Sequence, residues 1–152
     1  MRKSPKEHIS EAEWEVMRVV WANQPVDSKT IITILDEKLT WKPSTVKTLL
    51  KRLVDKQFLM TEKNGRGYLY HAKCLEKNII DDNIEELLSR VCDKDEAYLV
   101  QSMIKHAKLS KLDLRFLIDQ LKKDIDESPE EITCQCLPGQ CTCRHHQKGD
   151  VK

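Results

Sequence analysis

The sequence predicts a mostly α-helical protein with one small β-hairpin and a cysteine-rich tail. Signals that start helices recur along the chain, one glycine-containing turn separates two short β-prone runs, and four of the six cysteines fall between residues 134 and 143. No apolar run is long enough to span a bilayer, and the N-terminus leads into polar sequence in place of an apolar signal segment. We therefore expect a cytoplasmic protein with no membrane partner.

Charge is distributed unevenly along the chain, although the net charge is only +1. Residues 38–66 hold eight Lys and Arg against two acidic residues, whereas residues 76–96 hold eight acidic residues against three basic ones. A local excess of cations favours binding of a polyanion. We expect the first of these segments to bind one, and not the second.

Three helices are predicted in the N-terminal part. Ser10 with Glu13 has the pattern of a capping box, which starts a helix that runs to about residue 22. Asp27 caps a second helix, which extends to about residue 38 and in which Ile34 is expected to face the core. Pro43 opens a third helix, because the N–H that proline lacks would be unpaired in a first turn.

The third helix has one apolar and one polar face. Its polar face carries hydroxyl side chains near the N-terminal end and cations further along. This arrangement fits a recognition helix in a DNA major groove, where threonine methyls meet thymine methyls and cations meet phosphates. The alternative is a solvated charged face. The residues expected to contact DNA from this helix are Lys42, Ser44, Thr45, Lys47, Thr48, Lys51 and Arg52.

A β-hairpin is predicted directly after the third helix. Residues 59–63 and 68–72 are short β-prone runs, and Asn64-Gly65 between them favours a type I′ turn. Lys63 and Arg66 give the hairpin a basic tip that is expected to contact phosphate, the alternative being an ordinary solvated turn. Three short helices followed by such a hairpin indicate a winged helix-turn-helix that binds double-stranded DNA.

Three amphipathic helices are predicted beyond the hairpin. Asp93 with Glu96 is expected to cap the second of them and Ser110 the third. So short a helical region buries little surface alone, so packing against a second copy would complete its core, with a monomeric bundle as the alternative. We therefore expect a winged-helix DNA-binding domain over residues 1–73, a helical dimerisation region over 74–127, and a linker with a cysteine-rich tail over 128–152.

The tail cysteines, Cys134, Cys136, Cys141 and Cys143, follow the pattern C-x-C-x4-C-x-C. The intervening Pro138-Gly139 favours a chain reversal that would bring the four sulfurs together. Four thiolates suit Zn(II), and the C-x-C spacing also suits bridging thiolates around Cu(I). A pair of disulfides is the alternative, but it is disfavoured in a reducing cytosol.

Two histidines and two further cysteines are weaker candidates for metal ligands. His145 and His146 follow the tail cysteines and could add nitrogen ligands, although four thiolates already suffice. Cys74 and Cys92 stand apart from the tail and from each other, and isolated cysteines in apolar company are usually inert core residues. We expect no chemistry from these two.

Residues 8–73 resemble the BlaI/MecI penicillinase-repressor family. The pattern Trp41-x-Pro43-Ser44-Thr45-Val46-x-Thr48-Leu49-Leu50-x-Arg52-Leu53 is similar to the recognition helix of that family, and Gly65-Arg66-Gly67-Tyr68-Leu69-Tyr70 is similar to its wing. The four tail cysteines match those of the copper-responsive CopY-type transcriptional repressors within the family. The β-lactam-responsive branch is switched by proteolysis at an Asn-Phe dipeptide, which this sequence lacks; this argues against antibiotic sensing.

This resemblance implies a copper-responsive transcriptional repressor of a copper-efflux operon. It implies a homodimer with Zn(II) in the tail thiolates, bound to an inverted-repeat operator of the TACA-nn-TGTA type. Cu(I), donated in some cases by a copper chaperone, would act as the inducer by displacing the zinc. The alternative functions are a copper buffer or chaperone without DNA binding, and a thiol-redox enzyme. The chain lacks the C-x-x-C pattern of redox enzymes, so we expect no enzyme activity.

Overall fold

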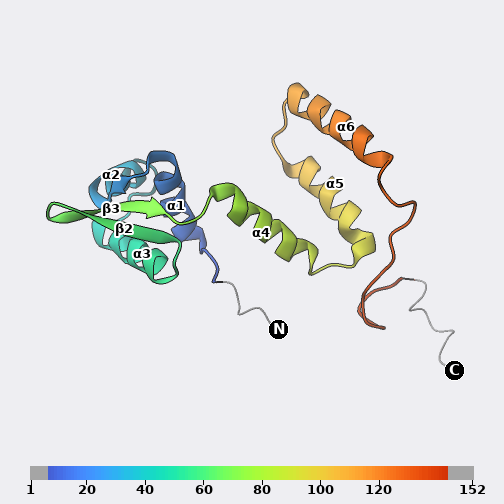
Figure 1. Ribbon diagram of the computed structural model, residues 1–152, viewed down its shortest axis with the longest axis horizontal. Helices are drawn as coiled ribbons and strands as arrows, with labels where there is room; N and C mark the ends of the chain where they lie inside the picture. Colours follow the sequence, from blue (N-terminus) through green and yellow to red (C-terminus); the bar gives the residue numbers. More distant parts are fainter. Residues whose placement is uncertain (1–6, 144–152) are drawn as a thin grey trace. The chain divides into compact units, whose positions relative to one another are not determined.

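The computed structural model describes residues 7–143, which form two compact units that divide between Asp81 and Asp82 (Figure 1). The first unit contains α1 (Glu11–Asn23), β1 (Val26–Asp27), α2 (Ser28–Leu39), α3 (Pro43–Asp55), β2 (Leu59–Asn64) and β3 (Gly67–Ala72). α4 (Glu76–Leu88) spans the division, and the second unit continues with a 3-10 turn η1 (Asp93–Asp95), α5 (Glu96–His106) and α6 (Lys111–Ile125).

The first two helices begin at the capping residues that the sequence indicates. The Glu13 N–H donates to Ser10 Oγ over 3.2 Å, and the Ser10 N–H donates back to Glu13 Oε2 over 3.0 Å, so both halves of the capping box form. At the start of α2, Asp27 Oδ1 accepts from the Thr30 N–H over 2.7 Å. These bonds satisfy backbone donors that lack partners in a first helical turn, and both predicted helix starts are confirmed.

One hydrophobic core joins α1, α2, α3 and the first residue of β2. Met17, Ile31 and Leu50 are fully buried, each from a different helix, and Leu59 of β2 closes the cluster. Burying a side chain of this size contributes about 1.5–3 kcal/mol, so the core holds α3 firmly against its neighbours. The prediction for Ile34 is wrong, because 37% of this residue is exposed. The buried residues of α2 are Ile31 and Leu35, and Ile34 lies to one side of the line that joins them.

A three-stranded antiparallel sheet in the order β1-β3-β2 completes the first unit. β2 and β3 form the hairpin that the sequence predicts, and this hairpin extends away from the three helices (Figure 1). Its turn differs from the prediction, because the loop consists of Gly65 and Arg66, flanked by the Asn64–Gly67 pair. Positive φ occurs at Gly65 (59°) and not at Arg66, which is the sign pattern of a type II′ turn and not of type I′.

The second unit has helices but no apolar core within one chain. Among residues 82–143, only Cys92 is buried. α6 begins with a capping box in which Ser110 Oγ accepts from the Asp113 N–H over 3.1 Å, as predicted. The predicted cap at Asp93 is wrong: Asp93 lies in η1, and α5 begins at Glu96 without a side-chain cap. No helix in the described part of the chain is both long and apolar enough to cross a membrane.

Candidate nucleic-acid interface and metal centre

α3 divides its residues between the core and the solvent. Val46, Leu49, Leu50 and Leu53 are buried, and they recur at three- and four-residue intervals on one side of the helix. Every helix residue that the sequence assigns to DNA lies on the other side and is exposed: Ser44, Thr45, Lys47, Thr48, Lys51 and Arg52, with Lys42 exposed at the N-cap. The fold therefore presents these side chains together on one surface of α3.

Thr48 is the one residue on this surface whose hydroxyl is tied to the helix. Its Oγ1 donates to the Ser44 carbonyl oxygen over 2.9 Å, a local bond that threonine commonly makes in helices. The hydroxyl proton is used in this bond, so Thr48 offers a base its methyl group and an oxygen that accepts. A methyl group suits contact with the thymine methyl in a major groove.

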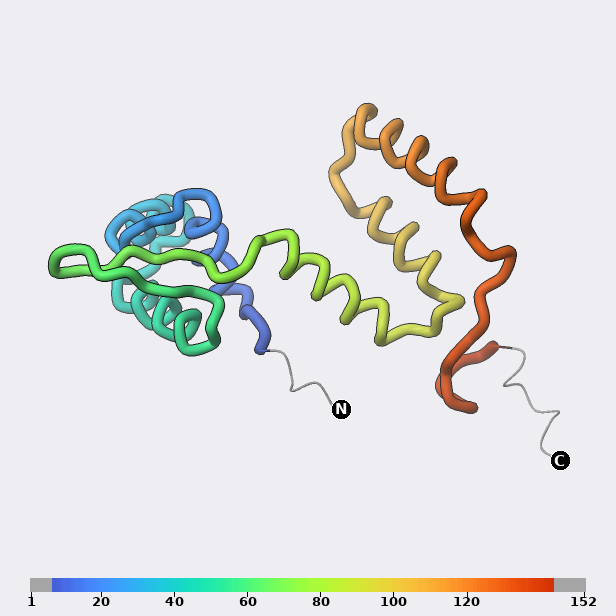
Figure 2. Tube along the Cα trace, in the orientation of Figure 1, coloured from blue at the N-terminus to red at the C-terminus, as the bar shows by residue number. Residues whose placement is uncertain are grey.

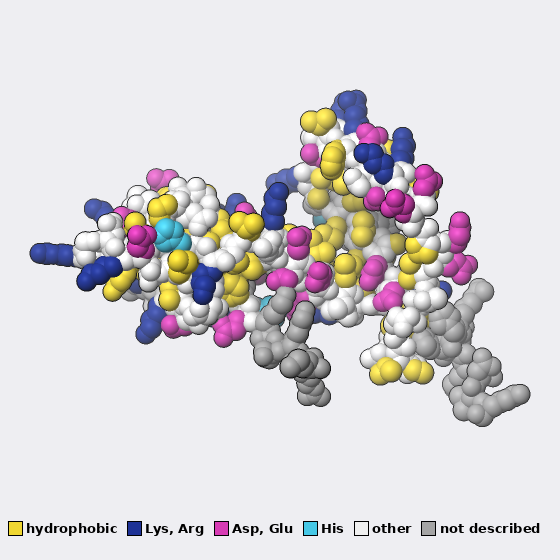
Figure 3. Space-filling model, in the orientation of Figure 1, with side chains coloured by type: hydrophobic (Ala, Val, Ile, Leu, Met, Phe, Trp, Pro, Cys, Tyr) yellow, Lys and Arg dark blue, Asp and Glu magenta, His cyan; other side chains and the backbone are white. Residues whose placement is uncertain are grey.

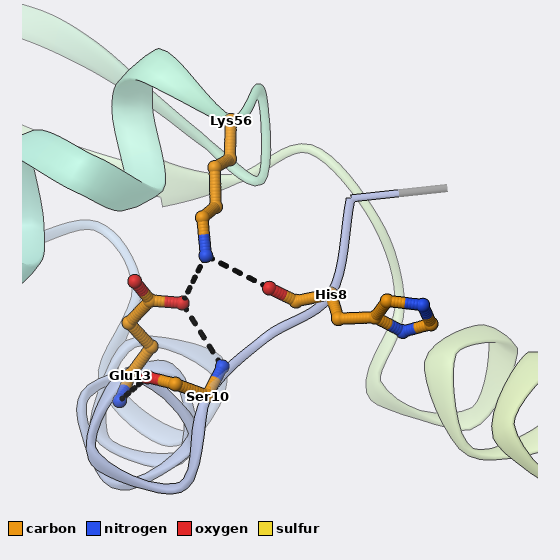
Figure 4. A network of polar contacts seen from close by, with 4 residues as sticks. All are labelled: His8, Ser10, Glu13 and Lys56. Atoms are coloured by element: carbon orange, nitrogen blue, oxygen red, sulfur yellow. Dashed lines mark hydrogen bonds and ion pairs between the residues drawn. The ribbon is translucent and has the colours of Figure 1, made fainter. Parts of the chain in front are cut away.

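The C-terminal end of α3 is fixed to the start of α1 by Lys56. Lys56 Nζ donates to Glu13 Oε2 and to the His8 carbonyl oxygen, both over 2.8 Å, and the Glu13 carboxylate also accepts from the Ser10 N–H (Figure 4). Burial alone would raise the pKa of Glu13, but the hydrogen bonds from Lys56 and Ser10 and the charge of Lys56 together lower it below its ordinary value. The pair holds the C-terminal end of α3 against the start of α1 and occupies the Lys56 ammonium group.

The wing carries the other two residues that the sequence assigns to DNA. Lys63 near the end of β2 and Arg66 in the turn are both exposed, and Figure 3 shows Lys and Arg side chains gathered at the far end of the hairpin. Closer to the helices, His71 Nε2 lies 3.0 Å from Glu62 Oε2 across the two strands. The hairpin thus presents cations at its tip, where a phosphate could be contacted.

The tail folds back on itself between its two C-x-C arms. The Gln140 N–H donates to the Leu137 carbonyl oxygen over 3.0 Å, and the Leu137 N–H donates to Gln140 Oε1 over 2.9 Å. Gly139 has a φ of 91°, which glycine tolerates because it has no Cβ. The predicted reversal is confirmed, and it brings Cys134 Sγ to 3.4 Å from Cys141 Sγ.

Cys92 lies in the same cluster as the tail cysteines. Its Sγ is 3.4 Å from that of Cys134 and 3.5 Å from that of Cys143. The sulfurs of Cys92, Cys134, Cys136 and Cys141 all lie within 4.8 Å of one another. The expectation that Cys92 is isolated is therefore wrong. No local pattern around Cys92 could reveal this, because the tail residues that meet it follow more than forty positions later.

The proximity of these sulfurs changes their acidity. Hydrogen bonding to Cys134, together with burial and the nearby Cys92 and Cys141, raises the pKa of Cys136 well above its ordinary value. Hydrogen bonding to Cys92 and Cys141, together with burial, raises the pKa of Cys143 to about 12. Several thiolates this close would repel one another, so without a cation the cluster favours neutral thiols.

An all-sulfur donor set of this kind can hold a metal ion. Soft thiolates suit Zn(II) and Cu(I), and four of them fill a tetrahedral shell, so the residues present fit a metal centre. None of the six cysteines, which all lie in the part of the chain that the structure describes, is joined in a disulfide. The candidate ligands His145 and His146 lie outside the described residues.

Comparisons with known proteins place the chain in a family. The family model "Penicillinase repressor" matches residues 9–123. A protein from Latilactobacillus sakei described as "Uncharacterized 16.5 kDa protein in ptsI 3'region" is 36% identical, over 91% of this chain and 95% of its own length. The penicillinase repressor of Bacillus licheniformis is 29% identical, over 86% of this chain and all of its own length.

A solved structure also aligns with part of the chain. The solution structure of the DNA-binding domain of the repressor BlaI shares 37% sequence identity, covers 51% of this chain and 93% of its own, and superposes with a TM-score of 0.44. The family assignment rests on the family model and on the full-length relatives. The chain belongs to the penicillinase repressor family and is a DNA-binding transcriptional repressor of that type, not an enzyme.

Proposed function

We propose that this protein is a copper-responsive repressor that binds an inverted-repeat operator of the TACA-nn-TGTA type in front of copper-efflux genes. It binds as a homodimer with Zn(II) in its cysteine cluster, and it leaves the operator when Cu(I) replaces the zinc. The observation that carries this proposal is the convergence of the tail thiols, with Cys134 Sγ 3.4 Å from Cys141 Sγ, in a member of a repressor family. The protein acts in the cytoplasm, where its thiols stay reduced.

The exposed surface of α3 and the tip of the β2–β3 hairpin would both contact DNA. Thr45 and Thr48 read thymine methyls in the major groove, while Lys47, Lys51 and Arg52 contact phosphates. Lys42 and Ser44 lie at the N-terminal end of α3, where backbone N–H groups also favour an anion. Lys63 and Arg66 reach the backbone beside the groove. All of these side chains are exposed, as this role requires.

Dimerisation is supported by the apolar side chains that the second unit leaves uncovered. Tyr98 and Met103 of α5 and Leu114, Leu121 and Ile125 of α6 are between 40% and 69% exposed, and Figure 3 shows hydrophobic side chains at the surface of these helices. Isolated helices gain most of their stability from packing an apolar face. A second copy of the chain would cover these apolar side chains with its own. A two-fold dimer would then present two recognition helices to a palindrome.

The switch has to act through geometry and not through charge. One Zn(II) with four thiolates carries the same formal charge as two Cu(I) with four thiolates, so the two states repel DNA equally. Zn(II) favours a tetrahedral shell of four ligands, whereas Cu(I) accepts fewer ligands and bridging thiolates. A change of metal therefore changes how the C-x-C arms are held, and the DNA-competent dimer is the state that zinc favours.

The test is fluorescence anisotropy of the zinc-loaded protein on a duplex with the TACA-nn-TGTA repeat, followed by anaerobic titration with Cu(I). We expect specific binding, which is lost as zinc is released. The matched pair of variants is Cys134→Ser, which should lose the copper response, and Cys74→Ser, which should keep it. Binding that survives excess Cu(I) would contradict the sensor, and absence of binding to any duplex would favour a copper buffer.

A further inference from the structure

We propose that Cys92 is a ligand of the metal centre, so that the shell is closed jointly by the tail and by the helical region. The inference rests on the proposed metal-binding role of the tail and adds a ligand that the C-x-C pattern does not contain. Cys92 lies between α4 and η1, and its Sγ is within 3.5 Å of the sulfurs of both Cys134 and Cys143.

The spacing of the sulfurs is close to that of a four-thiolate shell. Zinc–sulfur bonds of about 2.3 Å in a tetrahedron separate neighbouring sulfurs by roughly 3.8 Å. The Cys92–Cys134 and Cys134–Cys141 separations are both 3.4 Å, so a small expansion would admit the ion. The four sulfurs that lie within 4.8 Å of one another are those of Cys92, Cys134, Cys136 and Cys141, and four thiolates would suffice for a tetrahedral zinc shell.

The surrounding chain positions Cys92 for this role. Its carbonyl oxygen accepts from the Asp95 N–H over 2.7 Å, which fixes the turn into η1. Glu131 and Ile132, just ahead of the first tail cysteine, line an open pocket together with Asp93, Lys94, Glu96, Ala97 and Val100. The linker therefore runs beside the start of α5 and delivers the tail to Cys92. Figure 2 shows the chain after α6 returning toward this junction.

The burial of Cys92 also sets it apart from an ordinary surface thiol. It is 6% exposed, and it is the one buried residue among positions 82–143. The second unit therefore lacks a hydrophobic core within one chain and has the sulfur cluster as its most enclosed point. A metal bound there joins the tail to the junction of α4 and α5. An exchange of metal can then move helices of the proposed dimerisation region, which a tail that binds metal alone could not do.

The Cys92→Val variant tests the assignment, because valine keeps an apolar side chain of similar size and removes the sulfur. The matched control is Cys74→Val, the same change at the cysteine outside the cluster. Co(II) serves as a spectroscopic probe of thiolate number, and zinc affinity is measured by competition with a chromogenic chelator. For Cys92→Val we expect about a quarter of the sulfur-to-cobalt charge-transfer intensity to be lost, since one of about four thiolates is removed, and zinc binding to weaken at least tenfold. The control should match the wild type.

Two further measurements separate ligation from packing. Cys92→His supplies a nitrogen ligand and should recover part of the zinc affinity that valine loses. In the wild-type protein, mass spectrometry after alkylation should show that zinc slows modification of Cys92 while Cys74 reacts at an unchanged rate. Circular dichroism confirms that each variant keeps its helices. Wild-type zinc affinity and cobalt intensity in Cys92→Val, or unchanged alkylation of Cys92 when zinc is bound, would overturn the assignment.

The outcome can be distinguished from failure of the proposed function. If Cys92→Val binds zinc as the wild type does, while the wild type still leaves its operator on Cu(I) addition, only the role of Cys92 is refuted. If Cys92 is shown to be a ligand while Cu(I) leaves operator binding intact, the copper sensor is refuted and the ligand assignment stands. A wild-type protein that binds neither zinc nor cobalt would refute both.

Discussion

Lys56 Nζ donates to Glu13 Oε2 over 2.8 Å, and this contact connects the residue that follows α3 to the first turn of α1 (Figure 4). The Glu13 side chain is 2% exposed and that of Lys56 is 28% exposed, so the pair is partly withdrawn from water. The same carboxylate completes the capping box at Ser10. One side chain thus starts α1 and fixes the end of the helix that presents the candidate DNA-binding surface.

Glu13→Gln should lower the free energy of unfolding by about 2 kcal/mol, because it leaves the Lys56 ammonium partly buried without its counter-charge. Urea unfolding at neutral pH measures the effect. The matched control is Glu15→Gln on the same helix, whose partner Lys38 lies 3.0 Å away with 59% of its side chain exposed. An exposed pair of this kind contributes at most about 1 kcal/mol. Equal losses in the two variants would contradict the structural role of Glu13.

The same carboxylate makes stability depend on pH. Because the folded-state pKa of Glu13 is lowered from 4.5, its contribution is present above the unfolded pKa and is lost as pH falls through the folded value. The wild-type protein should therefore lose more stability than Glu13→Gln when the pH is lowered from about 7 to about 3. Urea midpoints measured across this range test the expectation, and parallel losses in both proteins would refute it.

Local sequence rules predict the starts of α1, α2 and α6 well, because the interactions that decide them span a few residues. The capping boxes at Ser10 and Ser110 and the cap at Asp27 each join residues three positions apart. The two-residue strand β1 is not predictable in this way, because its strand conformation depends on the distant pairing of Val26 with Tyr70. The same holds for Cys92, whose chemical setting depends on a tail that returns from forty-two residues away.

The turn between α2 and α3 contains a threonine in a left-handed conformation. Thr40 has a φ of 50° at the C-cap of α2, where a β-branched side chain is strained and glycine is not. Thr40→Gly should therefore raise the free energy of unfolding by about 1 kcal/mol. Thr40→Ala, which shortens the side chain but keeps its Cβ, should gain less. Denaturant midpoints of the two variants and the wild type measure these gains. A loss of stability in the glycine variant would contradict the proposal that Thr40 is strained.

Lys51 and Thr48 lie close together on the exposed side of α3 and should have different effects on DNA binding. Lys51→Ala removes a proposed phosphate contact, so it should weaken binding to all sequences and reduce the salt slope by about 1. Thr48→Ser keeps the hydroxyl but removes the methyl, so it should reduce the preference for thymine by about 1 kcal/mol at unchanged salt slope. Anisotropy titrations at several salt concentrations, on operator and base-substituted duplexes, measure both. An unchanged slope in Lys51→Ala would refute the phosphate assignment.

Leu121 tests whether the uncovered face of α6 is the surface that joins two copies. Its side chain is 54% exposed and lies one helical turn from Ile125, as expected for a side chain buried only on dimerisation. Leu121→Gln should cost about 2 kcal/mol in each protomer. Because a two-fold interface contains the residue twice, dimer dissociation should be favoured by about 4 kcal/mol, or nearly a thousandfold.

Sedimentation equilibrium measures the change, with Asp119→Gln as the control. Asp119 is exposed on the same helix but two residues from Leu121, and therefore on a different side. The control should keep the wild-type dissociation constant, and both variants should keep wild-type helical content. A dimer that Leu121→Gln leaves intact would mean that another surface joins the protomers. Operator affinity should fall in parallel with dimer stability, because a monomer presents only one recognition helix to a two-fold operator.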